Sequence, residues 1–203
     1  MKKFTDLRAW LDHLAKSGRL VATKKNVNLK HELAAIAKKL DGKSGVLFPG
    51  PGGHDIPVVS GFMSSRSWIA EAMGVPESEL LDAYKQAAEN PLRCNIVKNA
   101  PCQEVMHKEF DVRELLPVPT HSEHDSGPYI TAGLVIAKNP KTGVQNVSIN
   151  RIQVNSKDRM AVLILPRHLH SFQQAAEEMN QPLSVAVVIG IDPLTLLASQ
   201  AIA

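Results

Sequence analysis

The sequence predicts an α+β protein in which an N-terminal α/β-type domain is followed by a barrel-like β domain. Up to residue 90, stretches with helical periodicity alternate with short apolar runs. Beyond residue 100, alternating apolar runs, prolines and turns enclose one helical stretch, which favours a barrel-like sheet over a doubly wound one. We place the boundary between residues 100 and 115 and set the domains at 1–105 and 106–203.

The first domain is expected to contain helices that flank a small sheet. Residues 5–17 carry apolar side chains at helical spacing, with Thr5 as the N-cap. The other predicted elements are a strand at 20–23, a helix at about 29–40 capped by Asn28, strands at 46–48 and 56–62 around the PGPGG turn, a serine-capped helix at 64–74, and a helix at 76–90 that turns Leu80, Leu81, Tyr84 and Ala88 inward.

The second domain is expected to be built on a long hairpin. Its two alternating runs, 128–138 and 144–154, flank the turn sequence NPKTG. The remaining predicted elements are a strand at 160–165, a helix at 170–181, a fully buried strand at 183–190, and a helix at 192–200 opened by Asp192 with Pro193 at its first position.

Composition and charge narrow the class of protein. The 203 residues are 44% hydrophobic and 21% charged, as in an ordinary globular chain. The net charge of +3 comes from scattered lysines and arginines, which disfavours a nucleic-acid binder. No run approaches the roughly 18 apolar residues of a membrane span, so we expect a cytoplasmic protein. Cys94 and Cys102 form no CxxC pair and are expected to be reduced, structural thiols.

Asn146, Arg151 and His168 are the polar residues that are hardest to explain as surface. An amide oxygen, a cation and an imidazole suit a metal-linked phosphate and a carboxylate. In a straight strand Asn146, Ser148 and Asn150 share one face, whereas Arg151 has the opposite parity. A single site therefore requires a bulge or a strand end just before Arg151. The alternative is a polar strand facing solvent, with Arg151 in a surface ion pair.

Histidine pairs raise the alternative of a zinc site. His168 and His170 form an H-x-H pair, and His121 and His124 an H-x-x-H pair, but neither has cysteine or carboxylate partners at fitting spacing. One histidine with an amide better suits Mn²⁺ or Mg²⁺ bridging a phosphate. The polar segment 121–131, just before the predicted sheet, is a candidate rim of the site.

Collinear motifs run through the whole chain. They are FTDLRAWLDHL, LKHELAAIAKKLDG, IPVVSGFMSSRSWIAEAMGV, APCQEV, DSGPYITAG, NVSINRIQV, LPRHLHSF and LSVAVVIGIDPLTLLAS. Together they resemble the N-terminal part of the UbiD family, decarboxylases that use prenylated flavin mononucleotide (prenylated FMN). The resemblance implies that the second domain is a split β-barrel of the flavin-reductase type, here incomplete. It also implies reversible, non-oxidative decarboxylation of an aromatic, heteroaromatic or α,β-unsaturated carboxylic acid.

The resemblance also implies roles for individual residues. Asn146 and His168 match ligands of the divalent ion, Mn²⁺, that anchors the cofactor phosphate. Arg151 matches the catalytic arginine that lies beside the flavin and pairs with the substrate carboxylate, and this role predicts a bulge near residues 149–151. The remaining implied cofactor-binding residues are Ser148, Ile149 and Asn150 along the flavin, Arg167 near the phosphate, and Ser199 near the phosphate and K⁺.

The resemblance covers only part of a family member. The abrupt apolar end, LLASQAIA, also suggests a piece of a longer polypeptide. In the family, a glutamate metal ligand, the catalytic glutamates and an oligomerisation domain lie beyond the point that matches Ala203. We therefore expect no turnover by the chain alone, a flavin prenyltransferase that supplies the cofactor, and a homo-oligomer in the full-length protein. The alternative is a non-catalytic flavin-phosphate-binding fragment or subunit that needs a partner chain.

Overall fold

Helices and short strands alternate in the N-terminal part of the computed structural model, which describes residue 4, residues 6–92 and residues 94–201. The elements of this part are α1 (Leu7–Lys16), β1 (Leu20–Ala22), α2 (Glu32–Leu40), β2 (Gly45–Phe48), the 3₁₀ turn η1 (Pro51–Gly53), β3 (Val58–Ser60), α3 (Arg66–Met73), the 3₁₀ turn η2 (Glu77–Glu79) and α4 (Leu80–Glu89).

Strands dominate the C-terminal part. Its elements are the 3₁₀ turn η3 (Pro101–Gln103), α5 (Val112–Leu115), β4 (Tyr129–Ile130), β5 (Leu134–Lys138), β6 (Gln145–Ile149), β7 (Ile152–Val154), β8 (Met160–Val162), α6 (His168–Glu178), β9 (Val185–Val188) and α7 (Pro193–Ala198). In the described part of the chain, no helix is long and apolar enough to cross a membrane.

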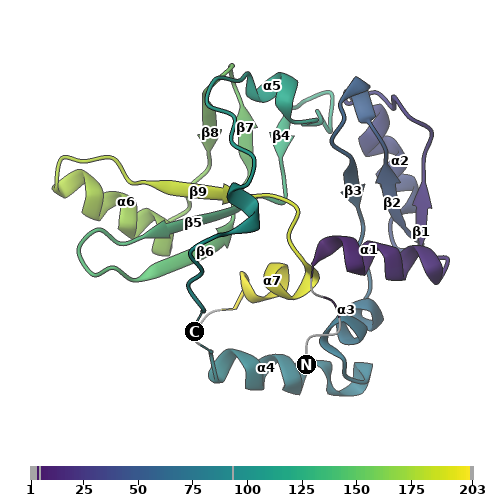
Figure 1. Cartoon of the computed structure of the whole chain (residues 1–203), viewed down its shortest axis with the longest axis horizontal. Coiled ribbons are helices and arrows are strands. Elements are labelled where there is room, and N and C mark those ends of the chain that lie inside the picture. The colour runs from purple at the N-terminus through teal and green to yellow at the C-terminus, as the bar shows by residue number, and fades with distance from the viewer. Residues whose placement is uncertain (1–3, 5, 93, 202–203) are drawn as a thin grey trace.

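The N-terminal sheet has the order β1-β2-β3, with β1 parallel to β2 and β3 antiparallel to β2. Helix α2 lies against this sheet (Figure 1). Val46 and Phe48 of β2 are buried with Leu33 of α2, and this apolar contact fixes the helix on the sheet. Trp10 and Trp68 anchor a second cluster, which joins α1 to α3.

The long hairpin of the C-terminal part is divided between two sheets. Strands β5 and β6 pair with each other in the sheet β6-β5-β9, whereas β4 and β7 pair in the sheet β4-β7-β8. Each run leaves one sheet and enters the other, the first near Gly133 and the second near Asn150. The Asn150 amide donates to the Gly133 carbonyl at 3.4 Å, and we call this point of the hairpin the corner. This corner separates the two sheets that Figure 1 shows in the upper and left parts of the molecule.

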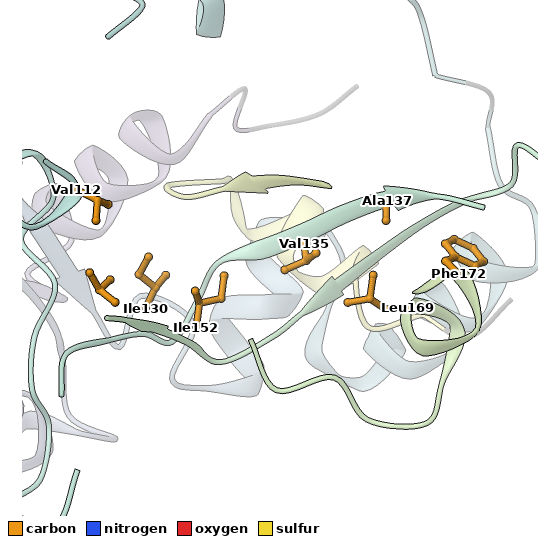
Figure 2. Close-up of a cluster of buried hydrophobic side chains, with 8 residues drawn as sticks. Val112, Ile130, Val135, Ala137, Ile152, Leu169 and Phe172 are labelled. Atoms are coloured by element: carbon orange, nitrogen blue, oxygen red, sulfur yellow. The ribbon is translucent and has the colours of Figure 1, made fainter. Parts of the chain in front are cut away.

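One apolar cluster links the two sheets across the corner. Figure 2 shows its side chains extending from Ile130 and Ile152, past Val135, to Leu169 and Phe172 of α6. Helix α6 packs on β5 and β6, so that its apolar face closes this end of the core. The burial of these side chains is the main force that holds α6 at the sheet.

The N-terminal predictions hold for the order of the elements, and three details were wrong. Asp6 caps α1 by accepting from the Ala9 amide at 2.9 Å, whereas Thr5 lies outside the described residues. Helix α2 begins at Glu32 rather than 29, because the Asn28 side chain instead accepts from the Lys30 amide and forms a local turn. Leu81 is exposed, because the 3₁₀ turn η2 precedes α4 and shifts its inner face to Leu80.

Two C-terminal predictions also need correction. The strand predicted at 183–190 as fully buried is β9, in which Val185 and Ala186 are exposed. Residues 144–154 are not one strand but two, because the chain leaves one sheet and enters another. The described strands form three separate three-stranded sheets and do not close into a barrel. The expected opening of α7 is confirmed, since Asp192 accepts from the amides of Leu194 and Thr195.

Candidate functional site

A ladder of polar side chains runs along β6. The Asn146 side-chain amide lies 3.4 Å from the Ser148 hydroxyl, which donates to Asn150 Oδ1 at 2.9 Å. The Asn150 side-chain amide in turn donates to the Leu163 carbonyl at 3.2 Å. The shared face that strand parity predicted for these three residues is therefore confirmed. All three are half-buried, which argues against a purely solvent-facing strand.

The ladder lies on the core side of its sheet. Asn146 is directly opposite Ala137 of β5, and Ser148 is directly opposite Val135. Opposite residues in an antiparallel pair project to the same face. Because Ala137 and Val135 belong to the buried cluster in Figure 2, the ladder faces the same interior. Ile149 has the other parity and is exposed.

Arg151 follows the ladder at the corner between the two sheets. Strand β6 ends at Ile149 and β7 begins at Ile152, so the chain has no strand conformation at residues 150 and 151. Of the two arrangements that a single site required, the chain has the strand end between Asn146 and Arg151, where a bulge near residues 149–151 had been expected. The Arg151 guanidinium lies over the Tyr129 ring, with Cζ 4.8 Å from the ring centroid. Within residues 4, 6–92 and 94–201, no carboxylate pairs with Arg151, which disfavours the predicted alternative of a surface ion pair.

The start of α6 carries Arg167 and His168. Arg167 is the N-cap residue of this helix and His168 its first residue, and both are exposed. The Arg167 side chain makes no capping hydrogen bond, so the first amides of α6 point to an open helix start. Leu169 packs in the cluster that contains Ala137, the cross-strand partner of Asn146. The start of α6 and the ladder on β6 therefore border the same part of the core.

The side-chain oxygen of Asn146 and the ring nitrogens of His168 are suited to bind a metal ion. Within the described residues, Asn146 Oδ1 accepts no hydrogen bond, and neither ring nitrogen of His168 has a hydrogen-bond partner. An amide oxygen and an imidazole nitrogen are ordinary ligands of Mn²⁺. The described residues contain no cluster of three histidine, cysteine, aspartate or glutamate side chains suited to a metal ion. A complete coordination sphere would therefore need ligands beyond Asn146 and His168.

Ser199 is at the other end of the C-terminal part. It is the C-cap residue of α7, and its hydroxyl donates to the Leu196 carbonyl at 2.6 Å. No described contact joins it to the ladder or to Arg151. Leu196 lines an apolar cavity of about 320 Å³ between the N-terminal sheet and β4. None of the eight residues predicted for the site lines this cavity.

Tyr129 is the residue that joins this cavity to the predicted site. It lines the cavity with His121 and Thr131 and also contacts Arg151. Segment 121–131, the predicted rim, thus borders the cavity at both of its ends. Sequence reasoning placed Tyr129 only in the candidate rim and did not predict its contact with Arg151, because the pairing of β4 with β7 brings the two residues together. Its aromatic ring in a polar segment was the one available signal.

Comparison with known families identifies the chain. Residues 95–203 match the 3-octaprenyl-4-hydroxybenzoate carboxy-lyase Rift-related domain, and residues 11–88 match the N-terminal domain of the same carboxy-lyases. The chain belongs to the UbiD family. The resemblance read from the motifs is confirmed, and the first of these two matches contains the ladder, Arg151 and His168.

Individual UbiD relatives are decarboxylases. Over 145 residues the chain is 42% identical to an anhydromevalonate phosphate decarboxylase of Methanothermobacter thermautotrophicus, a match that covers 71% of this chain and 34% of that protein. It is 31% identical over 216 residues to the phenolic acid decarboxylase of Sedimentibacter hydroxybenzoicus, covering 98% of this chain and 45% of that one. The chain thus spans less than half the length of these curated relatives.

Solved structures share the fold. The UbiD-class enzyme HmfF from Pelotomaculum thermopropionicum, in complex with FMN, superposes with a TM-score of 0.94 at 43% identity. That match covers 98% of this chain and 45% of HmfF. The closed form of the vanillic acid decarboxylase of Sedimentibacter hydroxybenzoicus gives a TM-score of 0.86 at 30% identity, over 97% of this chain and 45% of that one.

Proposed function

We propose that this chain forms the N-terminal part of a prenylated-FMN-dependent decarboxylase. Its substrate would be an aromatic, heteroaromatic or α,β-unsaturated carboxylic acid, and the reaction would replace the carboxylate by a proton and release CO₂, reversibly. The observation that carries the proposal is the ladder on β6, which ends at the corner where Arg151 emerges. The proposed metal ligand Asn146 and the proposed carboxylate-binding residue Arg151 thus lie at the two ends of the short segment 146–151.

The phosphate end of the cofactor is assigned to the ladder and the start of α6. Asn146 and His168 would hold Mn²⁺ through the amide oxygen and an imidazole nitrogen. Arg167 and the open start of α6 would attract the phosphate, because the first amides of a helix favour an anion. Ser199 would approach the phosphate and K⁺. Ser148, Ile149 and Asn150 would line the flavin along β6.

The substrate end is assigned to Arg151. Its planar guanidinium would pair with the substrate carboxylate through two parallel hydrogen bonds and orient the bond to be broken. Prenylated FMN, when bound, supplies an electron sink for the charge that remains after CO₂ leaves. We assign the proton donor and the third metal ligand to glutamates outside this chain. We also propose that a split barrel, and a homo-oligomer, form in the complete enzyme, with the cofactor supplied by a flavin prenyltransferase.

Cofactor loading and activity of the complete enzyme test the proposal. The complete UbiD-type enzyme that contains this chain would be produced together with a flavin prenyltransferase. We expect flavin absorbance, bound manganese, and CO₂ release from at least one acid of an aromatic, heteroaromatic and unsaturated panel. A protein without flavin or manganese would contradict the proposal. Flavin without CO₂ release from any acid would instead favour the non-catalytic flavin-phosphate-binding subunit.

Single substitutions separate the two ends of the site. Asn146→Ala should lower the affinity for manganese by at least about tenfold and reduce the flavin content. Arg151→Ala should keep the flavin but lower kcat/KM on the order of 100-fold, the effect of losing a charge-assisted pair. Gln145→Ala, on the opposite face of β6, and Arg159→Ala, an exposed arginine before β8, are matched controls. Flavin content per chain and steady-state kinetics are the measurements.

A further inference from the structure

Tyr129 holds Arg151 without using its hydrogen-bond donors. The guanidinium carbon Cζ lies 4.8 Å from the centroid of the Tyr129 ring, and Arg151 is an exposed residue. A cation over an aromatic face is attracted by the electron density of the ring, not through its N–H groups. The five N–H donors of Arg151 therefore remain available to a carboxylate.

Tyr129 is itself fixed by three contacts. Its backbone amide donates to the Pro119 carbonyl at 3.0 Å, and β4 pairs it directly with Gln153 of β7. Its hydroxyl shares a hydrogen bond of 3.0 Å with the Ser126 hydroxyl. The Gln153 side-chain amide donates to that same Ser126 oxygen, also at 3.0 Å. The ring is thus held at its backbone and at its tip.

We infer that Tyr129 is a positioning residue for carboxylate binding by Arg151. An arginine side chain that is free at a strand end loses much rotational freedom when it captures a ligand. A ring fixed on the neighbouring strand restricts that freedom before the acid arrives. The inference rests on the proposed role of Arg151, and it adds a residue on β4 to a site otherwise built from β6, the corner, α6 and the end of α7.

The contact itself can be measured on the 203-residue chain without cofactor or turnover. With ¹⁵N-labelled arginine, the Nε–H resonance of Arg151, assigned by its loss in Arg151→Lys, should carry a ring-current shift. Tyr129→Phe keeps the ring and should preserve that shift, whereas Tyr129→Leu should abolish it. An Arg151 resonance that is unchanged in Tyr129→Leu would overturn the inference.

Kinetics of the complete decarboxylase test the role. Tyr129→Leu should raise KM for the acid about two- to fivefold, the range of an exposed cation–π contact, with kcat per bound flavin nearly constant. Tyr129→Phe should restore KM close to the wild-type value. Tyr84→Leu, at the only other tyrosine of the chain, is the control for removing an aromatic side chain.

The Arg151 resonance and the kinetics together distinguish a failure of the inference about Tyr129 from a failure of the proposed function. A merely structural role for Tyr129 would lower the flavin content and the apparent kcat and leave KM unchanged, and this result would overturn the inference. A wild-type enzyme that loads flavin but releases no CO₂ would contradict the proposed function. In that case the arginine resonance would still decide whether Tyr129 holds Arg151.

Discussion

Glu71 of α3 binds two side chains that come from different elements. One carboxylate oxygen lies 2.7 Å from His13 Nε2 of α1, and the other accepts from Arg19 Nη1 at 2.7 Å. Arg19 also lies over the Trp68 ring, with Cζ 5.5 Å from the centroid. The hydrogen bond from Arg19, together with His13, lowers the pKa of Glu71 below its usual 4.5 despite partial burial.

The lowered pKa predicts a pH-dependent contribution to stability. A carboxyl group whose pKa is lower in the folded state stabilises that state at neutral pH, and the effect is lost as the pH falls below 4.5 through the lowered pKa. Glu71→Gln should therefore reduce the free energy of unfolding by about 1–2 kcal/mol near neutral pH, and by less in acid. Thermal unfolding of both proteins across this pH range is the measurement.

The exposed helix pair of Lys85 and Glu89 provides the control. Its charged atoms are 3.9 Å apart and both side chains are largely exposed. Glu89→Gln should change stability by less than about 0.5 kcal/mol at every pH. A loss for Glu71→Gln that stays constant from neutral to acidic pH would contradict the ionic origin of the effect.

At the residue scale, the sequence predicted the part of the candidate site that depends on parity. Asn146, Ser148 and Asn150 share a face because alternate residues of any strand do. The sequence also required a bulge or a strand end before Arg151, and the chain has a strand end there. It did not predict Tyr129, because a contact between residues of β4 and the corner depends on which strands pair.

At the scale of elements, the corner of the hairpin depends on Gly133. A Cβ at this position would lie 3.1 Å from Ile130 Cγ2 and 3.2 Å from Val187 Cγ1, both of which belong to or pack against the central cluster. The Gly133 carbonyl also accepts the Asn150 amide at the sheet change. A small residue is needed here because two sheets and their side chains meet at this point.

Gly133→Ala should therefore destabilise the corner. The added methyl group must displace buried side chains, which costs about 1–3 kcal/mol in a packed core. Chemical denaturation should show a lower midpoint with a similar slope. Ala132→Ser, at the exposed neighbour, should stay within about 0.5 kcal/mol of the wild type. Wild-type stability in Gly133→Ala would show that the corner can relax at no cost.

Helix starts show which element boundaries a sequence can predict. The caps at Ser65 and Asp192 were predicted correctly, because each bonds an amide two or three residues away. The start of α2 was wrong because Asn28 satisfies a local turn equally well, and the helix begins only after His31, whose φ is 68°. Residues 29–31 are instead held by backbone hydrogen bonds to Thr120, a residue far away in the sequence.

At the scale of the molecule, the segment from residue 94 to 110 contributes little to the core. Nearly every residue in it is exposed, and Ile96 is 99% exposed. Its short 3₁₀ turn, η3, is the only regular element between α4 and α5 in the described residues. Both cysteines lie here as free, exposed thiols, so neither has the structural role in the interior that was expected. A segment with so few buried contacts should open before the rest of the chain.

Limited proteolysis with a lysine-specific protease should therefore cut this segment first. Lys98 and Lys108 are both exposed within it, whereas the exposed Lys85 lies in α4. Proteases need an extended substrate, so the segment should be cleaved well before the helix. Intact-mass spectrometry should detect two fragments that divide the chain after one of these two lysines. In Lys98→Gln/Lys108→Gln that early cleavage should disappear, and first cleavage in α4 would contradict the prediction.

The sequence alone was enough for the α+β class, the order of elements, the shared face of the ladder and the family. Each of these depends on the periodicity of apolar residues, on local helix capping or on short sequence motifs. All three can be recognised within a few residues, without knowing which distant segments are in contact. The division of the hairpin between two sheets, the exposure of β9 and the contact of Tyr129 with Arg151 required the tertiary structure. Those features depend on strand pairing and on packing between residues far apart in the chain, where several arrangements satisfy the same local preferences.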